Sequence, residues 1–378
     1  MSWISAAAAL AVIAIVLIDT FQVMILPRRV SFKYRVARLY YHGAWIVWRA
    51  AAQWLPAGRR RNTILSVFGP LSLFGLLIVW AVGLIVGFGL LHWSVGTPIT
   101  YPHDSDDSLG TYLYFSGTTF FTLGYGDVVP TRALGRTLSV AESGLGFGFL
   151  AVVIGYLPVL YQAFSRREIT ISLLDARAGS PPSAGEFLRR FAAARSLASA
   201  GLLLAEWERW AAELLESHLS FPVLSYYRSQ HDNQSWLGAL TTILDTSALL
   251  IAGTGSPEGH QARLTFAMAR HAAVDLALVF QTPPLPPEAD RLPADQLERL
   301  TQSLRGSGLE WRDGIALADL RNLYEPFVIG LASYFRLTLP TFLPAKPPVD
   351  NWQTSAWMRR SPDLGGLPAA GTGDEHFD

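Results

Sequence analysis

The chain has no cysteine and only two lysines among its 378 residues, Lys33 and Lys346. Without cysteine there is no disulfide and no thiolate metal or redox site. The 30 basic and 30 acidic residues balance to a net charge of zero, which argues against a nucleic-acid partner. The sequence also lacks a nucleophile elbow, a phosphate-binding glycine loop and a metalloprotease motif. We therefore expect a protein that is not an enzyme and that needs no cofactor.

Half of the residues are hydrophobic, and three apolar runs are long enough to cross about 30 Å of hydrocarbon: 3–26, 64–91 and 133–164. The first run lacks the basic flank of a signal peptide. We therefore expect a retained transmembrane helix at 1–26, with a cleaved targeting segment as the alternative.

Segment 39–55 is apolar as well, but basic clusters lie at both of its ends and Arg49 lies within it. Crossing the bilayer would place one cluster on the wrong side. Within residues 27–63 we therefore expect a basic, amphipathic helix that lies along the inner leaflet and contacts its lipids.

The charges around the apolar runs predict the orientation. Loop 93–108 contains Asp104, Asp106 and Asp107 but no basic residue, whereas basic residues follow the first run, precede the second and follow the third. These basic residues are Arg28, Arg29, Lys33, Arg35, Arg38, Arg59, Arg60, Arg61, Arg166 and Arg167. The positive-inside rule then places the N-terminus outside and everything after 165 in the cytoplasm. Since arginine replaces lysine almost throughout, we expect a bacterial inner membrane protein.

Only one span precedes the pair formed by the second and third runs, so a four-helix voltage sensor is not predicted. Asp19 lies inside the first run, where a charge is costly. It is a candidate functional acid, and a simple ion pair with a nearby arginine is the alternative.

Between the second and third runs lies the sequence Thr-Leu-Gly-Tyr-Gly-Asp, residues 122–127. A potassium filter replaces the water around the ion with rings of backbone carbonyls. Carbonyls that point in one direction require disfavoured dihedral angles, which Gly124 and Gly126 reach without a Cβ clash. We expect the side chains of Leu123 and Tyr125 to pack away from the ion, and Asp127 to lie at the outer mouth.

Residues 108–121 precede this motif and are short, apolar and aromatic. They are too few to cross a bilayer, which is expected of a re-entrant helix capped by Asp107 or Ser108. An ordinary glycine-rich turn is the alternative, and the flanking spans argue against it.

From about 64 to 164 the chain resembles the two-span pore domain of prokaryotic potassium channels and of their inward-rectifier relatives. The resemblance implies an all-α membrane domain with an outer helix, a pore helix, a filter and an inner helix, assembled as a homotetramer. K⁺ would be the only bound metal ion. The implied filter residues are Thr122, Leu123, Gly124, Tyr125 and Gly126, with Asp127 at the outer mouth and Thr118, Thr119 and Glu142 as supports.

The expected inner helix contains several glycines, and glycine weakens a helix interior. By resemblance, Gly146 falls near the gating hinge, and Pro158 is a further kink site. Phe147, Leu150 and Ile154 recur at helical spacing, so they either line a hydrophobic gate or pack between helices. We expect Glu142 to lie behind the filter and to pair with backbone or hydroxyl groups.

We expect residues 165–343 to form an all-α cytosolic domain, because apolar positions recur every three or four residues. Helices are expected at 186–219, 232–252, 257–280, 294–305 and 315–337. No dinucleotide-binding, immunoglobulin-like or cyclic-nucleotide domain is indicated, and an unidentified cytosolic ligand is left open. A metal site is a weak alternative, built from His218, His231, His260, His271, Glu213, Glu216, Asp232 and Asp275.

Two further segments of the cytosolic half have no helical periodicity. Loop 226–236 is either a surface loop, which we favour, or a ligand or subunit contact. Residues 344–378 are rich in Pro and Gly and are expected to be disordered, with Trp352 and Trp357 docking back onto the domain.

The function these patterns predict is passive, potassium-selective conduction. The alternatives are a non-conducting membrane sensor or scaffold, whose helical half is the active part, and a pore that discriminates poorly between K⁺ and Na⁺.

Overall fold

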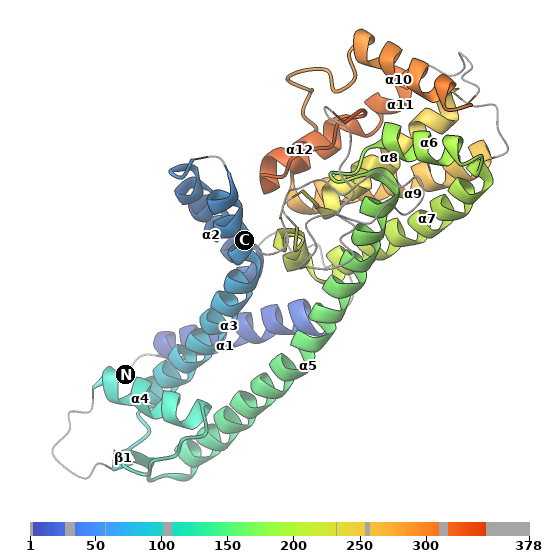
Figure 1. Ribbon diagram of the computed structural model, residues 1–378. Coiled ribbons are helices and arrows are strands. Elements are labelled where there is room, and N and C mark those ends of the chain that lie inside the picture. The colour runs from blue at the N-terminus through green and yellow to red at the C-terminus, as the bar shows by residue number, and fades with distance from the viewer. Residues whose placement is uncertain are drawn as a thin grey trace, which may run out of the picture. The chain divides into compact units, whose positions relative to one another are not determined.

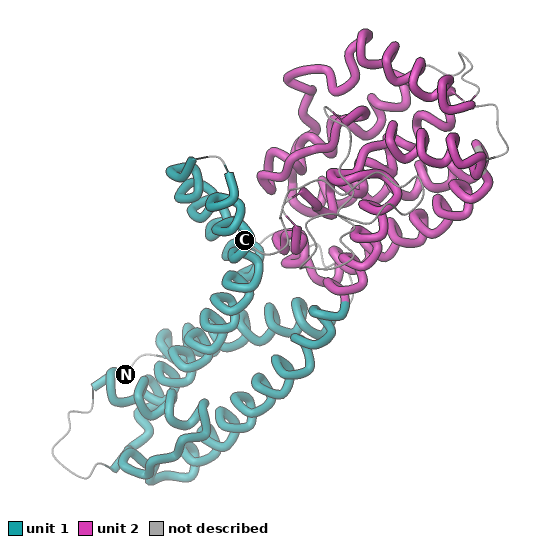
Figure 2. Tube along the Cα trace, viewed as in Figure 1, with its two compact units in different colours: residues 1–162 teal, residues 163–378 magenta. Residues whose placement is uncertain are grey.

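The computed structural model describes residues 3–26, 35–56, 58–100, 108–231, 233–253, 258–309 and 317–344. The chain forms two compact units, Met1–Gln162 and Ala163–Asp378 (Figure 2). Among the described residues, regular structure consists of twelve α-helices, one 3-10 helix and two strands of two residues each. The prediction of an all-α fold is confirmed.

Helix α3 (Arg59–Val95) is the scaffold of the first unit, and α1 (Trp3–Met24) packs antiparallel to its C-terminal half (Figure 1). Gly83 and Gly87 permit this approach: a Cβ placed on Gly87 would lie 2.6 Å from the side chain of Ile13. Small residues four positions apart are typical of closely packed membrane helices. At 1.5 Å per residue α3 is about 55 Å long, so it extends well beyond the hydrocarbon core.

A buried carboxylate joins α1 to α3 and to α2 (Val36–Gln53). Oδ2 of Asp19 accepts hydrogen bonds from the indole nitrogen of Trp80 at 2.9 Å and from the backbone nitrogen of Ala37 at 3.0 Å. The Ala37 amide belongs to the first turn of α2, where no partner exists inside the helix. Arg35 lies 3.8 Å from Oδ1, as the ion-pair alternative had it. Asp19 thus fixes the start of α2.

Helix α2 runs antiparallel to the N-terminal half of α3. The indole of Trp48 donates to the carbonyl of Ile64 at 3.0 Å, and the ring centroids of Trp45 and Phe68 lie 4.8 Å apart. Pairing with α3 was not part of the expectation for this segment, and contact with the inner leaflet stays a prediction.

The connection between α3 and the next long helix contains a short helix and a small ribbon. Strands β1 (Ile99–Thr100) and β2 (Val129–Pro130) pair antiparallel, and α4 (Leu109–Phe120) lies between them in sequence. Helix α5 (Ala133–Ala178) follows and is longer than the predicted inner helix, which was expected to end at 164. The ribbon therefore holds together the segment before α4 and the segment after it.

Within the described ranges, four helices are long and apolar enough to cross a membrane: α1, α3, α5 and α8 (Trp236–Gly253). Helix α8 differs from the others because 94% of its apolar stretch is buried inside the chain. It is therefore the core helix of the second unit, as expected for a segment inside the predicted cytosolic domain.

The second unit is a helical bundle with α8 at its core, and most of its other helices pack against α8. The helix bounds are α6 (Ala184–Ala193), α7 (Leu197–Ser220), a 3-10 turn η1 (Pro222–Tyr226), α9 (Glu258–Phe280), α10 (Ala294–Gly306), α11 (Leu317–Asn322) and α12 (Glu325–Phe335).

Two of the predicted cytosolic helices are wrong in continuity. The expected helix 186–219 is broken between α6 and α7, where Arg195 adopts a left-handed φ of 50°. The expected helix 315–337 is divided into α11 and α12 at Leu323–Tyr324, and Pro326 lies in the first turn of α12. A proline is tolerated at a helix start and not in its interior, which explains the second break. Hydrophobic periodicity continues across both breaks, so it predicted one continuous helix in each case.

Several expectations fall outside the described residues: the basic residues 28, 29 and 33, the acidic residues 104, 106 and 107, and the tail from 345 onward, including Trp352 and Trp357.

Candidate ion-conduction site

The segment after α4 is bonded directly to the last turn of that helix. The carbonyl of Thr118 accepts hydrogen bonds from the amides of Leu123 at 2.8 Å and Gly124 at 3.3 Å, and the carbonyl of Thr119 accepts from Thr122 at 3.0 Å. Both threonines named as supports therefore act through their carbonyl oxygens. The Thr118 hydroxyl is used elsewhere and donates to Phe115.

The backbone of the loop takes left-handed dihedral angles at alternate residues. The φ angles are 56° at Thr122, 54° at Gly124 and 77° at Gly126. No atom lies within 4 Å of a Cβ built on either glycine, so conformation and not space explains why glycine occurs there. The left-handed Thr122 was not foreseen, and such a threonine is a local strain.

The start of α4 matches only part of the capping prediction. Ser108 is the residue before the helix, and its carbonyl accepts the amide of Thr111 at 3.0 Å. Its hydroxyl lies 3.2 Å from the Thr111 hydroxyl and makes no hydrogen bond to a backbone amide of the first turn. The side-chain cap expected at Ser108 is therefore wrong.

The filter side chains that were expected to pack are exposed in the single chain. Leu123 is 53% exposed and Tyr125 68% exposed. Packing around them must come from outside the chain if the prediction is right.

The C-terminal end of the loop is hydrogen-bonded to α4. The hydroxyl of Tyr114 donates to Oδ2 of Asp127 at 2.8 Å, and Oδ1 of Asp127 accepts the amide of Val128 at 3.0 Å. No role for Tyr114 was predicted from the sequence. The pairing had no sequence signal, because the two residues are thirteen positions apart on different elements.

Glu142, on α5, contacts the pore helix behind the loop. One of its carboxyl oxygens, Oε1, is bonded to the hydroxyl of Ser116. The other, Oε2, lies 3.7 Å from Nε2 of His92 on α3. His92 is fully buried, and no pattern in the sequence indicates its closeness to Glu142.

The predicted gate residues occupy two different sides of α5. Phe147, Leu150 and Ile154 are 69%, 55% and 63% exposed in the single chain and share one face. Gly146 lies on a different, buried side, where an added Cβ would overlap the carbonyl oxygen of Phe120. Close packing against α4 therefore accounts for this glycine. Pro158 lies inside the helix.

In the second unit the start of the bundle is organised around Arg167, which is 3% exposed. Its guanidinium pairs with Glu168 at 2.8 Å and donates to the carbonyls of Leu224 and Tyr227 at 2.9 Å each. It also lies 3.3 Å from Nε2 of His218. Burial and the adjacent Arg167 lower the pKa of His218 well below its usual value. His218 is therefore a neutral acceptor here.

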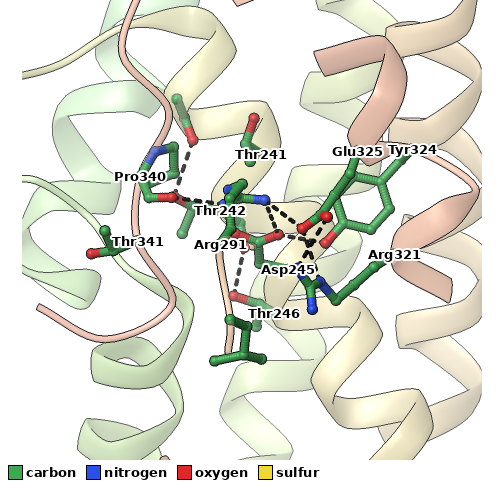
Figure 3. A network of polar contacts seen from close by, with 12 residues as sticks. Thr241, Thr242, Asp245, Thr246, Arg291, Arg321, Tyr324, Glu325, Pro340 and Thr341 are labelled. Atoms are coloured by element: carbon green, nitrogen blue, oxygen red, sulfur yellow. Dashed lines mark hydrogen bonds and ion pairs between the residues drawn. The ribbon is translucent and has the colours of Figure 1, made fainter. Parts of the chain in front are cut away.

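A second buried network joins α8, the loop after α9 and α12 (Figure 3). Arg291 binds both oxygens of Asp245, at 3.2 and 2.6 Å, and Oε1 of Glu325 at 3.0 Å. Tyr324 donates to Asp245, and Arg321 binds both oxygens of Glu325. Burial disfavours the charge, but the ion pair with Asp245 raises the pKa of Arg291 above its usual value. The network is thus a closed ion-pair cluster that fastens the bundle.

The metal alternative has no support in the described part of the chain, where no group of three His, Asp or Glu residues could hold an ion. His218 is committed to Arg167 and to the carbonyl of Leu214, and His271 only pairs loosely with Asp275, at 3.7 Å.

Loop 226–236, apart from residue 232, is described. Tyr226 is 5% exposed, and its hydroxyl lies 3.1 Å from that of Tyr334. Arg228 donates to the carbonyl of Arg336 at 2.8 Å. At its start, then, the loop packs into the bundle, contrary to the surface loop that was favoured.

Comparison with known proteins bears on the first unit above all. A family model described as an ion channel matches residues 75–162, which run from the middle of α3 through α4 and the loop into α5. Residues 75–162 are similar to ion channels.

Protein LctB of Bacillus caldotenax and protein LctB of Geobacillus stearothermophilus are each 31% identical over 88 residues, covering 21% of this chain and 65% of LctB. The chain thus spans just under two thirds of LctB. No solved structure gives a significant match.

The similarity to one membrane protein extends further. The uncharacterized membrane protein YdjJ of Bacillus subtilis (strain 168) is 26% identical over 278 residues, or 69% of this chain and 77% of YdjJ. The first unit has 162 of the 378 residues, so the alignment reaches into the helical unit. The chain is a multi-pass, all-α membrane protein, and the matches support an ion-channel function.

Proposed function

We propose that this protein is a potassium-selective channel that conducts K⁺ passively, as a homotetramer, through residues 122–127. The observation that carries the proposal is the loop backbone: three left-handed residues in alternation, with the inner end bonded to the last turn of a re-entrant helix. Alternating dihedral angles of this kind turn successive carbonyls toward one side, which is what an ion stripped of water requires.

Assembly from four copies follows from the single loop per chain, since one row of carbonyls cannot surround an ion. Two features support it. The side chains of Leu123 and Tyr125 are exposed in one chain. Only 17% of the apolar stretch of α5 is buried, which leaves a long face for lipid and neighbouring copies. Asp127 from each copy would add a negative ring at the outer mouth.

The exposed face of α5 supplies the proposed gate. Phe147, Leu150 and Ile154 would form a hydrophobic constriction below the filter, which closes by excluding water. The bend that opens it is assigned to Pro158 and not to Gly146, because Gly146 is packed against the carbonyl of Phe120.

We place the protein in the bacterial inner membrane with the N-terminus outside and the helical unit in the cytoplasm. The described basic residues near the predicted inner surface include Arg35, Arg59 and Arg60. Positive charge favours the cytoplasmic side. Arg167 is buried in the helical unit and therefore adds no charge to this surface.

The test is ion flux into liposomes that contain the purified full-length chain. We expect K⁺ and Rb⁺ to enter and Na⁺ to be refused. Equal entry of K⁺ and Na⁺ would leave a poorly selective pore, and no entry at all would favour the sensor or scaffold.

A closed gate would imitate the last result, so a second variant is needed. Ile154→Asn wets the proposed constriction and should increase K⁺ flux several-fold. Leu202→Asn is the matched control, because Leu202 is 73% exposed in the helical unit and its change should leave flux unaltered. If Ile154→Asn protein also passes no ion, the conduction proposal fails.

A further inference from the structure

His92, Ser116 and Glu142 form a fully buried polar cluster that joins α3, α4 and α5. All three side chains have no solvent exposure. Ser116 contacts the carbonyl of Ile85 at 2.8 Å as well as Oε1 of Glu142. In sequence the three residues are far apart, and they meet directly behind the turn that carries the filter.

We assign the hydrogen of His92 from the contacts of Thr97. The Thr97 hydroxyl lies 3.1 Å from the carbonyl of His92 and is assigned as the donor there. With that assignment the Thr97 oxygen accepts at its other contact, which is Nδ1 of His92 at 3.2 Å. Since Nδ1 is the donor, Nε2 of a neutral His92 has a lone pair, and this lone pair faces Glu142.

Nε2 of His92 and Oε2 of Glu142 are both buried and each lacks a hydrogen-bond partner. They lie 3.7 Å apart, so two lone pairs would oppose each other if the imidazole were neutral and the carboxylate ionised. A single hydrogen between them satisfies both atoms after a contraction of about 0.7 Å to ordinary hydrogen-bond length. Buried polar atoms without partners are costly, so the cluster favours the state with that hydrogen.

The other titratable groups nearby, in the part of the chain that the structure describes, are bonded elsewhere. Helix α4 contains no Asp, Glu, Lys, Arg or His, and its Tyr112 and Tyr114 donate to the Thr97 carbonyl and to Asp127. In α5 the nearest charged residue before Glu142 is Arg136, which donates to the carbonyl of Pro130, and after Glu142 it is Arg166. Asp19, on α1, is bonded to Trp80 of α3. None of these contacts supplies a charge to the pair.

We propose that His92 and Glu142 hold one proton between them and form a proton-binding site that fastens the outer, pore and inner helices together behind the filter. The bound proton keeps the pair neutral overall, whether it resides on the imidazole or on the carboxyl group. At alkaline pH the proton leaves, the lone pairs of Nε2 and Oε2 face each other, and the link between α3 and α5 weakens. The site depends on geometry within one chain and not on which ion the pore passes.

The test is the thermal unfolding midpoint of the full-length protein in lipid, followed by tryptophan fluorescence over neutral to alkaline pH. Glu142→Gln keeps the side-chain shape and provides amide hydrogens at every pH, so it replaces the shared proton permanently. We expect the midpoint of the wild type to fall, relative to that of E142Q, by several degrees as the pH rises. His92→Gln, which offers an amide hydrogen to Glu142, should likewise reduce the alkaline loss.

Asp19→Asn is the matched control: it neutralises another buried acid of the same unit and should keep the alkaline loss of the wild type. A midpoint difference between wild type and E142Q that stays constant with pH would overturn the proposal, and so would loss of the alkaline limb in D19N. Because unfolding involves no ion flux, either result is separate from a failure of potassium selectivity.

Discussion

Helices α5 and α8 are both apolar enough to cross a membrane, yet 17% of the apolar stretch of α5 is buried against 94% for α8. Helix α8 is enclosed by its own chain, and its polar residues, such as Asp245, are bonded to other elements of the same unit. Helix α5 leaves Phe147, Leu150 and Ile154 uncovered. The difference teaches that high hydropathy shows only that a helix is buried away from water. The packing around the helix decides whether lipid, another copy or its own domain covers it.

The polar groups of the two units differ in the same way. In the helical unit, Arg291 and Arg321 bind both oxygens of Asp245 and Glu325 within one chain. In the membrane unit, residues 122–126 of the predicted filter are exposed in one chain. The polar network of the helical unit is closed within one chain, whereas the predicted filter and the proposed gate residues are uncovered in one chain. Each prediction below tests one side of this contrast.

The largest effect is expected at the filter. Gly124→Ala puts a Cβ on a residue with φ of 54°, a conformation that costs non-glycine residues about 1–2 kcal/mol, in a loop whose carbonyl positions set ion binding. We expect K⁺ over Na⁺ selectivity to be lost in liposome flux. Gly155→Ala is the matched control, because nothing lies within 4 Å of its added Cβ. Equal selectivity in G124A and wild type would disprove the filter assignment.

The next largest effect is expected in the closed network of the helical unit. Arg291→Met removes the partner of Asp245 and Glu325 and leaves buried carboxylates under-compensated. Breaking a buried ion pair in this way costs about 3–5 kcal/mol, so the unfolding midpoint should fall sharply. Arg299→Met breaks an ion pair with Asp295 whose side chains are 66% and 70% exposed, and exposed pairs contribute about 0–1 kcal/mol. A similar fall of the unfolding midpoint in both variants would show that the buried network stabilises the unit no more than an exposed ion pair does.

A smaller effect is expected at Asp19, whose hydrogen bonds lie within the membrane unit of one chain. Asp19→Ala leaves the Trp80 indole and the Ala37 amide without their acceptor, and bonds to a charged group contribute about 1.5–3 kcal/mol each. We expect a lower thermal midpoint and earlier proteolysis between α1 and α2. Asp19→Asn retains an acceptor oxygen and should lose less than half as much. Equal losses would mean that charge and not hydrogen bonding matters.

The smallest effect is expected from His218. Its folded pKa is depressed, so the unfolded state takes up a proton near the usual 6.5 while the folded state does not. Stability is therefore full above pH 6.5 and declines as the pH falls below it, by at most about 1.4 kcal/mol per pH unit. His218→Gln should flatten the decline in a pH series of thermal midpoints. His271→Gln, at a residue 61% exposed, should leave it unchanged.

The sequence was most informative where local chemistry decides the structure. The all-α fold follows from helical periodicity, and left-handed angles at Gly124 and Gly126 follow from the residue type. Long apolar runs located α1, α3 and α5. These features depend on residues close together in the chain, so no knowledge of the packing was required.

What the sequence could not predict depends on distant residues. Nothing in the sequence pairs His92 with another residue, yet it is buried opposite Glu142, fifty positions later. Gly146 was placed near the gating hinge by family resemblance, yet the carbonyl of Phe120 occupies the space a side chain would need. Whether a glycine bends or packs, and whether a histidine is exposed or paired, is decided by the facing element.

The bonds that fasten Thr122, Leu123 and Gly124 to the end of α4 have a mechanical consequence. Three successive amides are held by carbonyls of one helical turn, so this part of the loop is braced by the end of α4. If residues 122–127 conduct as proposed, a bulkier or still-hydrated ion would meet the stiffness of a helix and not the compliance of a loop.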